Sequence, residues 1–206
     1  MGTLDNIGVH ITYDTQVSSG PASGWSDAQI GPNADLVESK STQRGSKKRI
    51  LSLNQGGTQV ATKEESGARP TLSIEDILSY PYLGLSFDHL PEEERPTVVI
   101  PKPGSRFDLG PGIDSSLIQP EHIIKIAEVC YEAMLSEEFD AIWLVCGSDT
   151  AAEVAAYLQI FIKNPTIPIV IQGSLDTIDE YGASDAKRNP RIALRESVQI
   201  LFQEYT

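Results

Sequence analysis

From residue 49 onward, short apolar runs alternate with longer segments of helical periodicity, and this alternation restricts the fold more than any other feature. The apolar runs are RILSLN (49–54), TVVIP (97–101), AIWLVC (141–146) and IPIVIQ (167–172). The last two do not alternate with polar residues, as expected for parallel strands covered on both faces. We therefore predict an α/β fold, a doubly wound parallel sheet of Rossmann or flavodoxin-like type, with at least four strands and helices on both faces.

Helical patterns occupy the segments between and after these runs. The segments are SIEDILSY, PEHIIKIAEVCYEAMLSEE, DTAAEVAAYLQIFIKN and AKRNPRIALRESVQILFQEY. In the third segment four large side chains share one helical face, which predicts a buried face: Val154, Tyr157, Leu158 and Phe161. Pro120 suits a first helical turn, and Ser148 or Asp149 suits a helix cap.

Residues 1–48 differ from the rest of the chain in composition. They are rich in Ser, Gly, Thr, Asn and Asp, and IGVHITYD is their only strand-like run. The 206 residues suffice for one domain with a sizeable core. We therefore divide the chain into a poorly structured tail or linker (1–48) outside the core and an α/β domain (49–206).

The charge balance argues against polyanionic partners. The formal net charge is -13, and residues 49–206 carry 24 acidic against 12 basic residues. We therefore expect no binding to nucleic acid or to anionic membranes. Neither a basic-then-apolar leader nor an apolar run of about 18 residues occurs in the sequence, so we expect a cytoplasmic protein. Cys130 and Cys146 lack zinc-site or redox spacing and are expected to be reduced core residues.

Clusters of glycine, hydroxyl and carboxylate residues fall where the predicted strands end. They occupy residues 56–58, 114–116, 146–149 and 173–174. A glycine pair directly after a strand allows a sharp turn, so that the Thr58 side chain projects from the carboxyl edge of the sheet. Several hydroxyls, one carboxylate and backbone N–H groups at a single edge can bind a small zwitterion. Each cluster alone is equally compatible with ordinary turns and caps.

Other kinds of site find little support in the sequence. The histidines, His10, His89 and His122, form no readable triad with serine or cysteine. No pair of His, Cys or carboxylate residues stands at ligand spacing with a second pair elsewhere, so we expect no metal. GPGIDSS matches neither a phosphate-binding loop nor a dinucleotide fingerprint.

Five segments resemble, in order and at compatible spacing, the motifs of the bacterial-type L-asparaginase family. They are LNQGGTQ, IDSSLIQPEHIIKIAE, AIWLVCGSDTAAEVAAYLQIF, IPIVIQGS and SDAKRN, and the resemblance covers residues 49–206. It implies an amidohydrolase that cleaves the side-chain amide of asparagine, or of glutamine, through an acyl-enzyme. It also implies that the reaction uses neither metal nor organic cofactor.

The resemblance also implies a role for each matched residue. Thr58 matches the nucleophilic threonine, and Gly57 before it belongs to the substrate-binding turn. Ser115 would hold the substrate α-carboxylate with help from Ser116, and Asp149 would hold the α-ammonium. Ser148 occupies the position of a second catalytic threonine, and its N–H could stabilise an oxyanion.

The sequence departs from the family pattern at four points. The loop tyrosine of the family falls in Gly67-Ala68-Arg69-Pro70, where Ala68 takes its place, and Cys146 replaces a family histidine. The catalytic lysine and the small second domain have no counterpart in residues 49–206. In the family, that second domain, supplied by a neighbouring subunit, helps to complete the active site, so we expect a homo-oligomer or a partner chain.

Two functions of different classes are therefore open. The first is an asparaginase-type hydrolase that is weak or incomplete as an isolated chain. The second is a catalytically weakened domain that keeps the amino-acid pocket as a binding or assembly module. Thr58, Ser148 and Asp149 favour the enzyme, whereas the departures favour the module.

Overall fold

A five-stranded parallel sheet forms the centre of the protein in a computed structural model that describes residues 10–13, 47–65, 67–79, 87, 90–180 and 184–203. The strand order is β1-β5-β2-β6-β7, and every neighbouring pair is parallel. The strands are β1 (His10–Tyr13), β2 (Arg49–Asn54), β5 (Thr97–Ile100), β6 (Ala141–Val145) and β7 (Ile169–Gln172). Because β6 and β7 pair in parallel, the predicted doubly wound sheet is confirmed.

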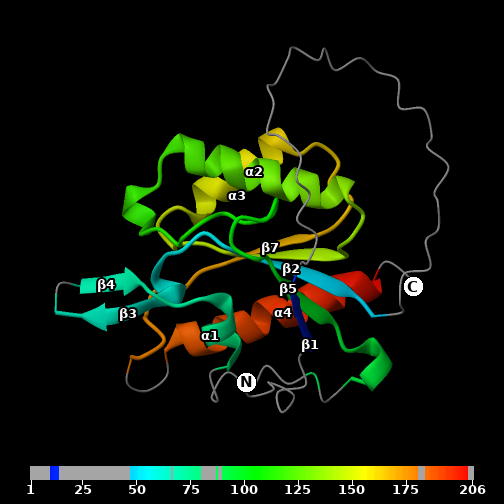
Figure 1. Ribbon diagram of the computed structural model, residues 1–206, viewed down its shortest axis with the longest axis horizontal. Helices are drawn as coiled ribbons and strands as arrows, with labels where there is room; N and C mark the ends of the chain where they lie inside the picture. Colours follow the sequence, from blue (N-terminus) through cyan, green and yellow to red (C-terminus); the bar gives the residue numbers. More distant parts are fainter. Residues whose placement is uncertain are drawn as a thin grey trace.

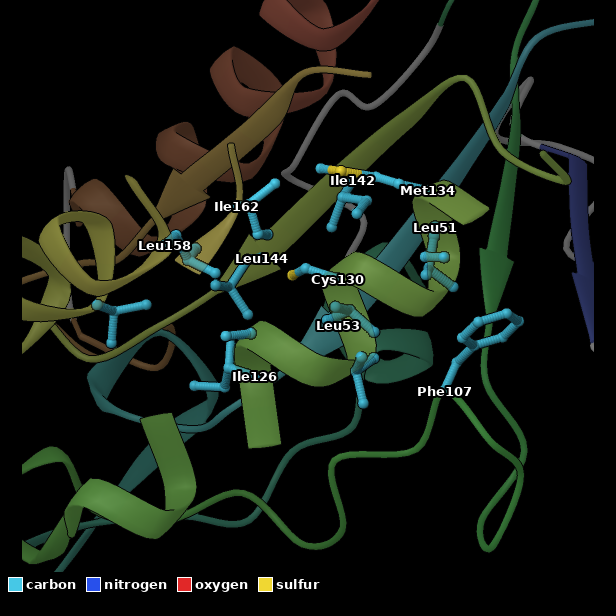
Figure 2. Close-up of a cluster of buried hydrophobic side chains, with 14 of the residues drawn as sticks. Leu51, Leu53, Phe107, Ile126, Cys130, Met134, Ile142, Leu144, Leu158 and Ile162 are labelled. Carbon is cyan, nitrogen blue, oxygen red and sulfur yellow. The ribbon is translucent and has the colours of Figure 1, made fainter. Parts of the chain in front are cut away.

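Helices cover both faces of this sheet (Figure 1). On one face lie α2 (Pro120–Leu135) and α3 (Ala151–Phe161), and on the other lie α1 (Ile74–Ser79) and α4 (Asp185–Gln203). Side chains of alternating strand residues enter one of two hydrophobic clusters. Figure 2 shows the cluster beneath α2 and α3, where Leu51, Leu53, Ile142 and Leu144 meet Ile126 and Leu158. Two buried faces explain why these strands lack polar alternation.

Among the described residues, the strand β1 is the one strand of the sheet that lies within residues 1–48, the segment predicted to be a poorly structured tail outside the core. His10–Tyr13 pair with Thr97–Ile100 of β5 and extend the sheet by one edge strand. The physical reason is that β5 otherwise ends the sheet on that side with unpaired N–H and C=O groups, which a strand-like run can satisfy. Residues 1–9 and 14–46 lie outside the described residues, and the domain boundary at residue 48 stays a prediction.

The helix α3 differs from the prediction in the side chains that it buries and in the residue at which it begins. Val154 and Leu158 are buried, but Tyr157 and Phe161 are 37% and 52% exposed. The two aromatic rings stack on each other, with centroids 5.9 Å apart, instead of entering the core. The helix begins at Ala151 with Thr150 as its cap residue, one position later than predicted. The face of α3 that packs against β6 and β7 is narrower than the apolar face predicted from the sequence, so only part of that face is buried. Pro120 occupies the first turn of α2 as predicted.

A small antiparallel hairpin lies between β2 and α1. Its strands are β3 (Ala61–Glu64) and β4 (Gly67–Pro70), and a 3-10 turn, η2 (Thr58–Val60), leads into it from β2. The hairpin contains Ala68, which pairs with Lys63 and is exposed. No helix within the described part of the chain is long and apolar enough to cross a membrane.

Glycines allow three loops to meet where β2 and β6 end. Gly57 has φ +80°, and a Cβ placed on it would lie 2.3 Å from the Gly147 Cα. A Cβ on Gly147 would in turn lie 2.2 Å from the Ser115 Cβ. Side chains at Gly57 and Gly147 would therefore force the loops after β2, β5 and β6 apart.

Replacing Gly57 by alanine should destabilise the fold more than the backbone angle alone predicts. We expect Gly57→Ala to lower the free energy of unfolding by roughly 2–5 kcal/mol, from a strained φ and from overpacking together. Gly104→Ala is the matched control, because Gly104 has φ +77° but no atom within 4 Å of an added Cβ. Urea denaturation of both variants measures the difference, and equal losses would contradict a close backbone contact.

Both cysteines are free and buried, as predicted. Cys130 lies on α2 within the cluster shown in Figure 2, and burial raises its pKa to about 12. Cys146 follows β6, and burial, opposed by a hydrogen bond with Thr150, raises its pKa to about 11. Because the thiolate is the nucleophile, neither thiol is set up for reaction.

The native chain should therefore resist thiol alkylation. At pH 8 we expect iodoacetamide to modify neither Cys130 nor Cys146 in the folded state and to modify both in concentrated urea, because burial disfavours the thiolate and blocks access. Intact-mass measurements over time give the extent of labelling. Rapid labelling of Cys146 in the native chain, with Cys130 protected, would indicate an activated thiol and would contradict the core assignment.

Candidate active site at the carboxyl edge of β2 and β6

The predicted site residues meet at the topological switch point of the sheet. The connections after the neighbouring strands β2 and β6 leave toward opposite faces, the first leading to α1 and the second to α3. In open α/β sheets this divergence creates a crevice at the carboxyl edge, where ligands bind. Thr58 follows β2, and Ser148 and Asp149 follow β6, so both groups stand at this edge.

Gln55 ties the three loops of the site together. Its N–H donates to the Val145 carbonyl (2.9 Å), and its own carbonyl accepts from the Ile113 N–H (2.9 Å). Its side-chain Oε1 accepts from the Gly147 N–H at 3.2 Å. One buried residue thus fixes the end of β6, the loop before Ser115 and the turn that leads to Thr58.

Ser115 and Asp149 form the central polar contact of the site. The Ser115 hydroxyl donates to Asp149 Oδ2 at 3.2 Å, although the two residues are 34 positions apart. Ser115 is buried at the start of η4 (Ser115–Leu117), whereas Asp149 is exposed. A hydroxyl beside a solvent-facing carboxylate can bind both ends of an amino acid: the carboxylate attracts an ammonium group, and the hydroxyl donates to a carboxylate.

Thr58 is connected to Ser115 through the close contacts of Gly57 and Gly147. It directly follows Gly57, which packs on Gly147, and Gly147 packs on Ser115. Its side chain is half-buried, while Gln59 and Val60 in the same turn are fully buried. The turn η2 therefore begins beside the loops that carry Ser115 and Asp149. The nucleophilic role of Thr58 stays a prediction.

The remaining predicted residues are placed differently. Both the N–H and the hydroxyl of Ser116 donate to Asp114 Oδ1, at 2.9 and 2.8 Å, so this hydroxyl is engaged in the turn rather than with Asp149. These two bonds hold the pKa of Asp114 below its usual range. Ser148 is half-buried, and its N–H has no acceptor among the described residues. An N–H without an acceptor is a donor that an oxyanion can use.

A general base is not evident among the described residues. Lys187 Nζ donates to the Glu180 carbonyl at 2.7 Å. Lys163 follows the carboxyl end of α3, whose amino end is at the site. The imidazole of His122 accepts from the Gln119 N–H at 2.9 Å and so caps α2. His89 lies outside the described residues.

Among the described side chains, no three His, Cys, Asp or Glu residues come together as metal ligands. The arrangement offers a hydroxyl, a carboxylate and backbone donors. These groups suit the binding and acyl transfer of a small polar substrate.

The sequence analysis did not single out a buried network of glutamines beside the site. The Trp143 Nε1 donates to Gln172 Oε1 (3.3 Å), Gln172 Nε2 donates to Gln59 Oε1, and Gln59 Nε2 donates to the Ala186 carbonyl (2.8 Å). The available signal was Gln172 at the end of the apolar run 167–172, whereas Gln59 lies in a polar turn and gave none. Buried polar side chains of this kind require hydrogen-bond partners, and those partners cannot be identified from the sequence.

Comparison with known proteins relates this arrangement to one family. Residues 49–203 match the family profile described as asparaginase, N-terminal. An L-asparaginase from Thermococcus kodakarensis is 35% identical over 146 residues, which are 71% of this chain and 39% of that protein. The chain thus spans about two fifths of the length of this relative.

Solved structures of asparaginases share the fold. The thermostable L-asparaginase from Thermococcus kodakarensis matches with a TM-score of 0.56 and 34% identity, over 72% of this chain and 40% of that one. L-asparaginase I from Vibrio cholerae matches with a TM-score of 0.55 and 22% identity, over 73% and 41% of the two chains. The second likeness is one of fold alone. The profile match over most of the chain and the 35% identity together show that this chain belongs to the asparaginase family, matching its N-terminal domain.

Proposed function

We propose that the chain is an asparaginase-type amidohydrolase that acts on the side-chain amide of L-asparagine or L-glutamine and is weak or incomplete in isolation. The observation that carries this proposal is the Ser115–Asp149 hydrogen bond beside the Gly57–Gly147 contact. It supports a role for Ser115 and Asp149 in binding a zwitterion near Thr58 at the sheet edge. The family membership and the L-asparaginase relative support the same chemistry.

In the proposed reaction, the substrate replaces the Ser115–Asp149 hydrogen bond: Asp149 accepts hydrogen bonds from the substrate α-ammonium, and the Ser115 hydroxyl turns to donate to its α-carboxylate. The Thr58 oxygen then attacks the side-chain amide carbon, and the C–N bond breaks as a proton passes to the leaving nitrogen. Ammonia leaves, and water hydrolyses the threonine ester to give aspartate or glutamate and the free hydroxyl. The Ser148 N–H is suited to stabilise the oxyanion of both tetrahedral intermediates.

A second function is favoured by the placement of the lysines. Since Lys187 is bound to the Glu180 carbonyl and Lys163 is at the far end of α3, neither is positioned to deprotonate Thr58. A domain with the binding pair but without a base would serve as an amino-acid-binding or assembly module. In either case we propose a homo-oligomer or a partner chain to complete the site. Free buried thiols support a cytoplasmic location.

The binding half of the site is tested by removing its carboxylate. We expect Asp149→Ala to weaken aspartate binding at least about 30-fold, because a charge-assisted hydrogen bond contributes roughly 2 kcal/mol. Thr58→Ala should leave binding unchanged, because the hydroxyl acts mainly in the transition state. Isothermal titration calorimetry gives both affinities.

Glu153→Ala is the matched control for Asp149→Ala. It removes one exposed carboxylate from the first turn of α3, the helix that follows Asp149, and Glu153 has no hydrogen bond with Ser115. We expect this control to bind aspartate normally. An Asp149→Ala chain that bound aspartate as tightly as the control would remove the proposed binding site.

The catalytic half is tested by ammonia release. With asparagine and glutamine as substrates, we expect slow release, at least roughly 10²-fold below that of the Thermococcus kodakarensis enzyme assayed alongside, because general-base help is missing. Thr58→Ala should abolish what remains. Release by the wild-type chain that persists in Thr58→Ala would exclude the threonine acyl-enzyme, and aspartate binding without any release would favour the module.

A further inference from the structure

A proline inside α4 leaves one helical carbonyl without its usual donor. Pro190 has no N–H, so it cannot bond to the carbonyl of Ala186 four residues earlier, and its ring crowds that carbonyl. Instead, the Ala186 carbonyl accepts from Gln59 Nε2 at 2.8 Å. The side chain of a residue 127 positions away therefore replaces the missing intrahelical bond.

The other end of the Gln59 carboxamide is held as firmly. Its Oε1 accepts from Gln172 Nε2, and the Gln172 Oε1 accepts from the Trp143 indole N–H. Gln59 and Trp143 are fully buried. Reversing the Gln59 amide would set NH₂ against NH₂ and oxygen against the Ala186 oxygen, so its orientation is fixed.

This anchor acts on the residue next to Thr58. Gln59 and Val60 are both buried and hold η2 from the inside, and Gly57 holds it from the other end through Gly147. Thr58 is the residue between these two anchors, and its side chain is only half-buried. The backbone that carries the hydroxyl is thus fixed on both sides.

We propose that Gln59 is a positioning residue for the Thr58 hydroxyl, docked on the Ala186 carbonyl that Pro190 leaves open. The inference rests on the proposed threonine chemistry. Gln59 does not touch the substrate; it sets the place of the nucleophile relative to Ser115 and Asp149. Because a misplacement of about 1 Å can cost roughly 10²-fold in rate, loss of the anchor should be visible in turnover.

The first test removes the carboxamide while keeping its volume. We expect Gln59→Met to lower kcat for ammonia release about 10- to 100-fold, because the Ala186 carbonyl and Gln172 lose their partner and η2 is released. KM and the Kd of aspartate should stay within about twofold, because Ser115 and Asp149 are untouched. Release from asparagine labelled with ¹⁵N in the amide measures slow turnover.

The second test leaves Gln59 in place and changes its docking point. Pro190→Ala supplies the helical N–H, which competes for the Ala186 carbonyl and draws it back toward the helix axis. Because a carbonyl can accept two bonds, we expect a smaller fall in kcat, about three- to tenfold, again with KM unchanged. Alanine also favours the helix, so the helical circular dichroism should be kept or increased while turnover falls.

A matched control is Gln199→Met, which removes an exposed glutamine from α4, the helix that contains Pro190. It should change neither kcat nor KM. Two results would overturn the positioning role in a wild-type chain that releases ammonia: a Gln59→Met variant with the wild-type kcat, or a Gln59→Met variant that loses aspartate binding in parallel with rate. The proposed function would stand in both cases. A wild-type chain that releases no ammonia overturns the proposed catalysis and this inference with it.

Discussion

The contact between the backbones of Gly57 and Gly147 determines the geometry of the whole site. It is possible because β2 and β6 are neighbours whose following loops diverge to opposite faces of the sheet. At this point the two backbone segments approach so closely that neither glycine could carry a side chain. Thr58 and Ser148 are the next residues in each loop, so their closeness is a consequence of strand order and of two missing Cβ atoms.

The centre of the sheet could be predicted from sequence because its strands are buried on both faces. Leu51 and Leu53 face one cluster while Ile50 faces the other, and Ser52 between the leucines is buried with its hydroxyl donating to the Val99 carbonyl. The edges were less readable. The pairing of His10–Tyr13 with β5, and the outward position of Phe161, depend on which neighbours are present, and a local pattern carries no such information.

The same distinction applies to the candidate site. Thr58, Ser115 and Asp149 could be assigned because a family resemblance fixed their order, and the Ser115–Asp149 bond is consistent with that assignment. The glutamine network could not be predicted, because Gln59 and Gln172 are 113 positions apart and each alone reads as a polar residue at a strand end. Hydrogen-bond satisfaction is a property of the folded chain rather than of any segment.

The proposed binding residues and the proposed nucleophile therefore differ in the contacts that hold them in place. Ser115 and Asp149, the proposed binding residues, contact each other directly. Thr58 makes no such direct contact and is held through Gly57 and Gln59. Binding in the ground state needs only the first arrangement, whereas acceleration needs groups whose interactions strengthen in the transition state. Under the proposed roles, a chain without a general base loses turnover long before it loses recognition, and the proposed amino-acid pocket is the part of this domain best able to persist without catalysis.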